Sequence, residues 1–168
     1  MGALCIFVGC GYLGFKVGDQ YRQRTEILRY LQNGFNLLET EISYSSTPLP
    51  LALTRIAEKM RGLSQIPFAH AAKLLKHNQG LTAAEAWEEG VSCLALEFPL
   101  SREEISILVL FGHGLGCSAR EEQMKNIVLA REQLRMAERA AEEARMKNQR
   151  MWQYMGLCTG GIIVLVLI

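Results

Sequence analysis

Apolar positions crowd the two ends of the chain, and every charged side chain lies between them. All 18 Lys and Arg and all 17 Asp and Glu fall within residues 16–150. As helices, the uncharged ends 1–15 and 151–168 would span about 22 Å and about 27 Å, close to the ~30 Å of a hydrocarbon core. We therefore predict transmembrane helices at 1–18 and 151–168, with the lipid bilayer as a partner and a separate domain at 19–150.

The first apolar run has two other interpretations. A secretory signal peptide needs a basic residue before its apolar segment, whereas Lys16 follows this one. The Val8-Gly9-Cys10 stretch resembles a lipoprotein cleavage site but lacks the same basic region. Neither is favoured over a transmembrane helix. Whether the mature protein keeps this first helix is left open by the sequence.

Basic residues flank both predicted spans on the side of the charged domain. Segments 16–29 and 139–150 each hold four Lys or Arg and two Asp or Glu, a net charge of +2, which leaves −3 for residues 30–138. The excess of cations beside the spans predicts a cytoplasmic domain. The five cysteines form no CxxC pair, which suits reduced cytoplasmic thiols. We expect a two-span protein of the cell membrane.

The charged middle has the signals of an all-α bundle. Three capping boxes, in which a hydroxyl residue precedes a Glu by three positions, begin at Thr82, Ser101 and Ser118, while Pro48 and Pro50 suit the first turn of another helix. No segment alternates apolar and polar residues for the length of a strand. Helices are expected at 2–44, 48–60, 67–78, 83–96, 102–111 and 119–167.

The first and last of these helices carry apolar seams with alternating spacings of three and four. The seams consist of Leu28, Leu31, Phe35, Leu38 and Ile42, and of Ile127, Ala130, Leu134, Ala137, Ala141 and Ala144. This pattern predicts an antiparallel pair of long helices, continuous with the spans. Alternatively, each seam faces the core of the bundle.

Two pairs of glycines at a spacing of four lie in or beside the predicted spans. Gly14 and Gly18 form the first pair, and Gly156 and Gly160 form the second. Small residues at this spacing let helix backbones approach closely in lipid. All four are therefore candidates for packing between membrane helices.

Candidate chemistry is sparse. His113 and Cys117 are too few ligands for zinc, and the Gly112–Gly116 stretch lacks the Lys of a phosphate loop, so it is interpreted as a junction between helices. No nucleophile, base and acid can be assembled, and carboxylates such as Glu138 are expected to pair along their own helix. With a net charge of +1, nucleic acid is not an expected partner. We expect no enzyme activity, metal or cofactor.

Several blocks nevertheless resemble the stage III sporulation protein AB family. They are Leu38-Glu-Thr-Glu-Ile-Ser-Tyr44 with Thr47-Pro-Leu-Pro50-x-Ala52-Leu53, Gly80-Leu-Thr-Ala-Ala-Glu-Ala-Trp87, Phe111-Gly-His-Gly-Leu-Gly116 with Arg120-Glu-x-Gln123-x-Lys125, and Lys147-Asn-x-x-Met151-Trp152-x-Tyr154-x-Gly156. The resemblance covers nearly the whole chain. It departs at Ala119, where the family often has Asp before the last helix.

The resemblance implies a part of a channel-like complex between the mother cell and the forespore, in the mother-cell membrane around the forespore. The family's cytoplasmic bundle is similar to that of the F platform proteins of type II secretion and type IV pilus systems. By that analogy the partners are a cytoplasmic secretion-type ATPase, stage III sporulation protein AA, and other stage III membrane proteins. The expected function is therefore a non-enzymatic platform that couples this ATPase to the membrane assembly.

The candidate docking residues lie where the two long helices end and begin, farthest from the predicted spans. They are Glu41, Tyr44, Pro48 and Pro50 at one end, and Arg120, Glu121, Gln123 and Lys125 at the other. The plainer interpretation is that these residues only close the end of the bundle. The alternative function is a membrane-anchored sensor or small enzyme with a helical domain, which a polar pocket with convergent titratable groups would favour.

Overall fold

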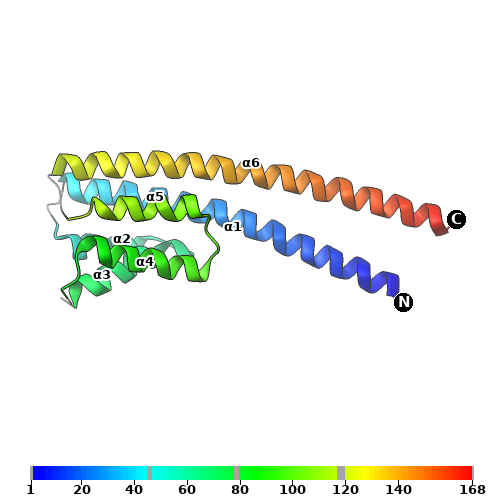
Figure 1. The fold of residues 1–168 in the computed structure, drawn as a ribbon, viewed down its shortest axis with the longest axis horizontal. Helices are drawn as coiled ribbons and strands as arrows, with labels where there is room; N and C mark the ends of the chain where they lie inside the picture. The colour runs from blue at the N-terminus through cyan, green and yellow to red at the C-terminus, as the bar shows by residue number, and fades with distance from the viewer. Residues whose placement is uncertain (1, 45–46, 78–79, 117–119, 168) are drawn as a thin grey trace. The chain divides into compact units, whose positions relative to one another are not determined.

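The computed structural model is all-helical over the residues that it describes (Figure 1). It describes the backbone of residues 2–44, 47–77, 80–116 and 120–167, and the side chains of residues 20, 22–44, 47–77, 80–116 and 121–147. Its helices there are α1 (Gly2–Tyr44), α2 (Leu49–Lys59), the 3-10 helix η1 (Gly62–Gln65), α3 (Ile66–Lys76), α4 (Ala83–Glu97), α5 (Arg102–His113) and α6 (Arg120–Leu167). The predicted all-α class and the six predicted helices are confirmed, whereas η1 was not predicted.

Two compact units share the long helices. One contains residues 1–25 and 139–168, and the other contains residues 26–138. In the described part of the chain, no helix combines the length and the apolar character needed to span a bilayer. The side chains of the predicted spans, 1–18 and 151–168, lie outside those that the structure describes, so the spans stay a prediction.

The four candidate glycines lie in the same segments, whose side chains the structure does not describe. Gly14 and Gly18 fall within the backbone of α1, and Gly156 and Gly160 fall within that of α6. The side chains around Gly14, Gly18, Gly156 and Gly160 are outside the described ones. The structure therefore does not test the close packing that was expected at these glycines, and it stays a prediction.

Two predicted capping boxes fix the starts of α4 and α5. The Thr82 hydroxyl accepts from the Glu85 backbone N–H at 3.2 Å, and the Glu85 carboxylate accepts from the Thr82 N–H at 2.7 Å. The N–H of Thr82, and then its hydroxyl, lower the pKa of Glu85 by stabilising the carboxylate. Ser101 and Glu104 repeat the arrangement in α5. The third predicted box, at Ser118, lies outside the described residues.

Four aromatic rings from four helices form the centre of the 26–138 unit. Trp87 of α4 lies 5.0 Å from Phe68 of α3 and 5.2 Å from Phe111 of α5, measured between ring centroids. Phe35 of α1 lies 4.3 Å from Phe111 and 6.1 Å from Trp87. The indole N–H of Trp87 donates to the Leu108 carbonyl at 2.8 Å, so its polar atom is satisfied in the core.

Polar contacts join α1 to α6 at intervals of seven residues. Ser43 lies 3.3 Å from the sulfur of Met124. Seven residues back along α1 and seven forward along α6, Arg131 donates to Asn36 and, at 2.8 Å, to Glu39. Seven residues further, Glu138 accepts from Arg29 at 2.8 Å and from Gln32 at 2.7 Å. The predicted antiparallel pairing is therefore present in this unit, and one helix face repeats along it.

These contacts also correct one expectation, because Glu138 pairs across to α1 rather than with a base further along its own helix. An ion pair within α6 does occur, between Glu132 and Arg135 at 3.2 Å. The side chain of Glu138 is only 14% exposed, and its hydrogen-bond partners come from α1, the neighbouring helix.

Both interpretations of the apolar seams hold in part. The seam positions Leu28, Leu31, Phe35, Leu38, Ile127, Ala130 and Leu134 are all buried. Phe35 contacts rings of α3, α4 and α5, so the seam of α1 faces the bundle core. The polar contacts between α1 and α6 then run beside the seams, and the two helices pair while each contributes to the shared core.

Candidate partner-binding site at the tip of the bundle

The tip is the end of the 26–138 unit at which α1 ends and α6 begins. The contact between Ser43 and Met124 brings the end of α1 to the start of α6 there. The two groups of candidate residues, which are about 75 positions apart in sequence, therefore lie at the same end of the bundle. This is the placement that antiparallel long helices require.

The first group of candidates divides into structural and exposed residues. Glu41 lies 3.5 Å from Arg55 of α2 and accepts from the Thr47 hydroxyl at 3.3 Å, so it links α1 to the next helix. Pro50 lies in the first turn of α2, and its carbonyl accepts from Thr54 at 2.8 Å. Tyr44, by contrast, is 86% exposed, and Pro48 is also exposed. Tyr44 is thus a large, exposed aromatic side chain that the tip offers to a partner.

The second group lies along the first turns of α6. Glu121 and Lys125 are exposed and Gln123 is half-buried. The side chain of Arg120 lies outside the described ones. Glu121 lies in the first turn of α6, where the helix dipole favours an acidic residue. Lys125 follows one turn later, so the described start of α6 carries both exposed carboxylates and an exposed cation.

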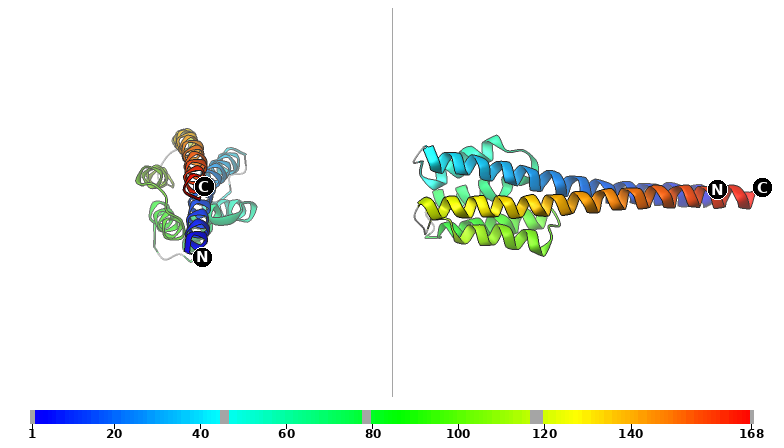
Figure 2. Two further views of the ribbon diagram at one scale, coloured as in Figure 1. Left: turned by 90° about the vertical axis from the view of Figure 1, so that its right-hand side faces the viewer. Right: turned by 90° about the horizontal axis from the view of Figure 1, so that it is seen from above.

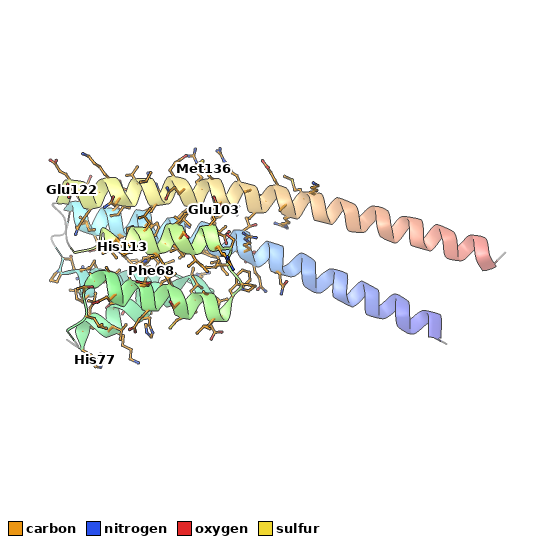
Figure 3. The ribbon with its side chains drawn as sticks, viewed as in Figure 1. Phe68, His77, Glu103, His113, Glu122 and Met136 are labelled. Atoms are coloured by element: carbon orange, nitrogen blue, oxygen red, sulfur yellow. The ribbon has the colours of Figure 1, made fainter. Side chains whose placement is uncertain are left out.

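Other exposed side chains at the tip were not predicted as contacts. His77 follows the last residue of α3, His113 ends α5, and Glu122 lies in the first turn of α6, all at the same end of the unit (Figure 3). The sequence contained a signal for them, because short antiparallel helices must alternate direction. The ends of α1, α3 and α5 and the starts of α2, α4 and α6 therefore meet at one end.

One cluster of titratable side chains lies away from the tip, between α3 and α4. The sulfur of Cys93 is 3.9 Å from both ring nitrogens of His70, and Glu89 is 3.8 Å from the same ring. In the described residues, no three His, Cys, Asp or Glu are placed to hold a metal ion. His113 lies in this part of the chain, whereas Cys117 lies outside the described residues. The Gly112–Gly116 stretch ends α5 and leads toward α6, as the interpretation as a helix junction predicted.

This fold and tip define a small helical bundle in which the long helices α1 and α6 run antiparallel and end in an exposed tip. The profile of the stage III sporulation protein AB family matches residues 1–168. Stage III sporulation protein AB of Bacillus subtilis (strain 168) is 32% identical over 168 residues, covering 99% of this chain and 97% of the relative. A solved structure of stage III sporulation protein AB is similar with a TM-score of 0.69 at 30% identity, covering 74% of this chain and 98% of its own.

The chain therefore belongs to the stage III sporulation protein AB family. The family resemblance found in the sequence blocks is confirmed, and it extends over the whole chain. Membership places the protein among the proteins of sporulation stage III, and the fold is shared with a solved member of the family.

Proposed function

We propose that this protein is a non-enzymatic platform subunit of the stage III sporulation complex, and that it couples a cytoplasmic secretion-type ATPase to the membrane assembly. The match of the family profile to all 168 residues carries the proposal. The tip supports it, because Tyr44 and Lys125 are exposed at the end of the bundle where α1 ends and α6 begins. The ATPase, stage III sporulation protein AA, would dock there, and other stage III membrane proteins would be neighbours.

The platform role requires anchorage, which the distribution of charge supports. Residues 1–18 and 151–168 would cross the mother-cell membrane around the forespore, and residues 19–150 would lie in the cytoplasm. The pair of Gly14 and Gly18, like the pair of Gly156 and Gly160, would let a membrane helix approach the other one or a neighbour. The tip would then be the part of the bundle farthest from the bilayer, within reach of a cytoplasmic motor.

Cysteine labelling tests this orientation. In a full-length chain without its native cysteines, Ser92→Cys provides a single thiol on the exposed face of α4. When vegetative cells express the chain in their plasma membrane, a membrane-impermeant maleimide should leave this thiol unlabelled while the cells are intact and label it after permeabilisation. Labelling in intact cells would place the domain on the other side of the membrane and remove the basis for docking a cytoplasmic ATPase.

Charge reversal at the tip tests the docking surface. Lys125→Glu, and Arg120→Glu with it, should weaken binding of the ATPase about tenfold, or ~1.4 kcal/mol, since these cations would face the partner. Folding should be unaffected, because exposed ion pairs contribute only about 0–1 kcal/mol each. Arg135→Glu, an exposed position further along the same helix, is the matched control.

Co-purification of the ATPase from membranes is the measurement, with circular dichroism to check the fold. Binding by the tip variants should also become less sensitive to salt. If both reversals leave binding intact while Gly156→Leu abolishes complex formation, the tip is not the docking surface. Contacts within the bilayer would then have to carry the coupling.

A further inference from the structure

Charge is divided between two neighbouring faces of the bundle. The segment from α2 to α3, residues 49–76, contains five cations and one carboxylate, Glu58. Arg55 pairs with Glu41, and the other four cations, Lys59, Arg61, Lys73 and Lys76, are exposed. We name these four the basic face. In the described part of the chain, none of the four has an ion-pair partner.

The next helix has the opposite character. Between Ala83 and Glu97, α4 contains four carboxylates and no cation. Glu85, Glu88, Glu89 and Glu97 are all exposed, and we name them the acidic face. Glu85 caps its own helix and Glu89 lies 3.8 Å from His70, while Glu88 and Glu97 have no ion-pair partner among the described residues.

Among the described residues, the four cations of the basic face form no ion pair with the carboxylates of α4. Helix α3 packs on both α2 and α4, and the near contact of His70 with Glu89 is the ion pair found between α3 and α4 in the described residues. In the end-on view of Figure 2, α2 and α4 lie on different sides of the bundle. Both faces therefore present unneutralised charge outward, although the whole chain has a net charge of only +1.

We propose that the basic face of one copy docks on the acidic face of another, so that the protein associates laterally with itself. Each face provides the charge that the other lacks, and such complementarity steers association and fixes the orientation of partners. The near-zero net charge means that whole copies do not repel one another. A contact between two different faces is heterologous, so it can extend beyond a dimer.

The positions of the charged residues along the axis of the bundle are compatible with copies that lie side by side and point in the same direction. Gly90 of α4 lies against Pro67 of α3, and the two helices run antiparallel from there to the junction between them. Lysines end α3 in its last turn, and Glu85 and Glu88 are in the first two turns of α4. Equal height is what anchorage in one membrane demands, and to that extent the inference rests on the proposed function. Confinement to a membrane would also raise the effective concentration of the copies.

Co-purification of two differently tagged full-length chains, extracted from the same membranes, tests the proposal. Variant A combines Lys73→Glu with Lys76→Glu, and variant B combines Glu88→Lys with Glu89→Lys. Each leaves the cap of α4 and the tip candidates intact. A double variant of Glu103→Lys and Glu143→Lys is the control, because it makes the same change in charge as B at exposed positions on α5 and α6 away from the tip. ATPase recovery is measured in the same preparations.

Wild-type chains should co-purify, and this should weaken several-fold in about 1 M salt, where the screening length falls to about 3 Å. Two copies of A, or two copies of B, should co-purify several-fold less than wild type, with ATPase recovery unchanged. A mixed with B should co-purify again, because the intact acidic face of A complements the intact basic face of B and the two reversed faces complement each other. The control should match wild type.

Three results would overturn the proposal. They are no co-purification of wild-type chains, no loss with A or B, or no recovery when A and B are mixed. Loss of the ATPase with variant B, while the copies still co-purify, would assign the acidic face to a basic partner protein instead. Loss of the ATPase with the tip variants alone would test only the proposed docking.

Discussion

Replacing Leu134 with Asp should lower the free energy of unfolding by about 3–5 kcal/mol. Leu134 is fully buried on the inner side of α6, between the levels of the Arg131 and Glu138 contacts to α1. Asp would lose the leucine's apolar burial and bring a carboxyl group into the seam. The bases nearest along α6 and α1 are already engaged, since Arg131 binds Glu39 and Arg29 binds Glu138.

A matched control lies on the same helix. Leu129 is 53% exposed, so Leu129→Asp should change stability by no more than about 0.5 kcal/mol. Denaturant unfolding of a 20–150 fragment measures both variants. Equal midpoints for the two variants would mean that the seam of α6 is not part of the core.

The helix ends were predictable from the sequence because their determinants are local. A capping box needs only two side chains three residues apart, and those at Thr82 and Ser101 start α4 and α5 where the spacing placed them. The buried seam positions were predictable for a similar reason, since a spacing of three and four residues puts side chains on one face of any helix. The antiparallel direction then follows from two long helices joined by a compact segment.

The partners of these faces were not predictable, because they depend on how the helices are arranged. Glu138 has bases nearby on its own helix, yet it pairs with Arg29, some 109 positions earlier. The core ring cluster joins Phe35 to Trp87 and Phe111, and nothing in their spacing marks them as neighbours. At the tip, exposed groups at the ends of α3 and α5 join the candidate residues only once each short helix has a direction.

The division of charge between α2–α3 and α4 likewise could not be interpreted from the sequence without the arrangement of the helices. The counts could be read from the sequence, but a helix with four carboxylates is usually a solvated face. The proposal of two complementary surfaces needed the exposure of both faces, the His70–Glu89 contact between α3 and α4 in the described residues, and the antiparallel course of these helices. The tip proposal and the lateral proposal therefore use different residues, and the variants that test them are independent.

Trp87→Ala should lower the free energy of unfolding by about 3–5 kcal/mol, since it empties the middle of the ring cluster. Trp87 is fully buried and contacts rings from α1, α3 and α5. A Cβ on Gly112 of α5 would lie only 2.6 Å from the indole, so the backbone of α5 approaches the ring closely. The other three rings are held on separate helices, and the cavity can close only if those helices shift.

Trp87→Phe distinguishes the contribution of the aromatic ring from that of the indole hydrogen bond. It keeps an aromatic side chain and loses the N–H that donates to the Leu108 carbonyl, so it should cost about 1–2 kcal/mol. Leu96→Ala, on the exposed face of the same helix, should stay within about 0.5 kcal/mol of wild type. Thermal and denaturant unfolding should rank Trp87→Ala as the least stable variant, Trp87→Phe as intermediate and Leu96→Ala as the most stable. If Trp87→Ala matches Leu96→Ala, the ring cluster does not hold α1, α3, α4 and α5 together.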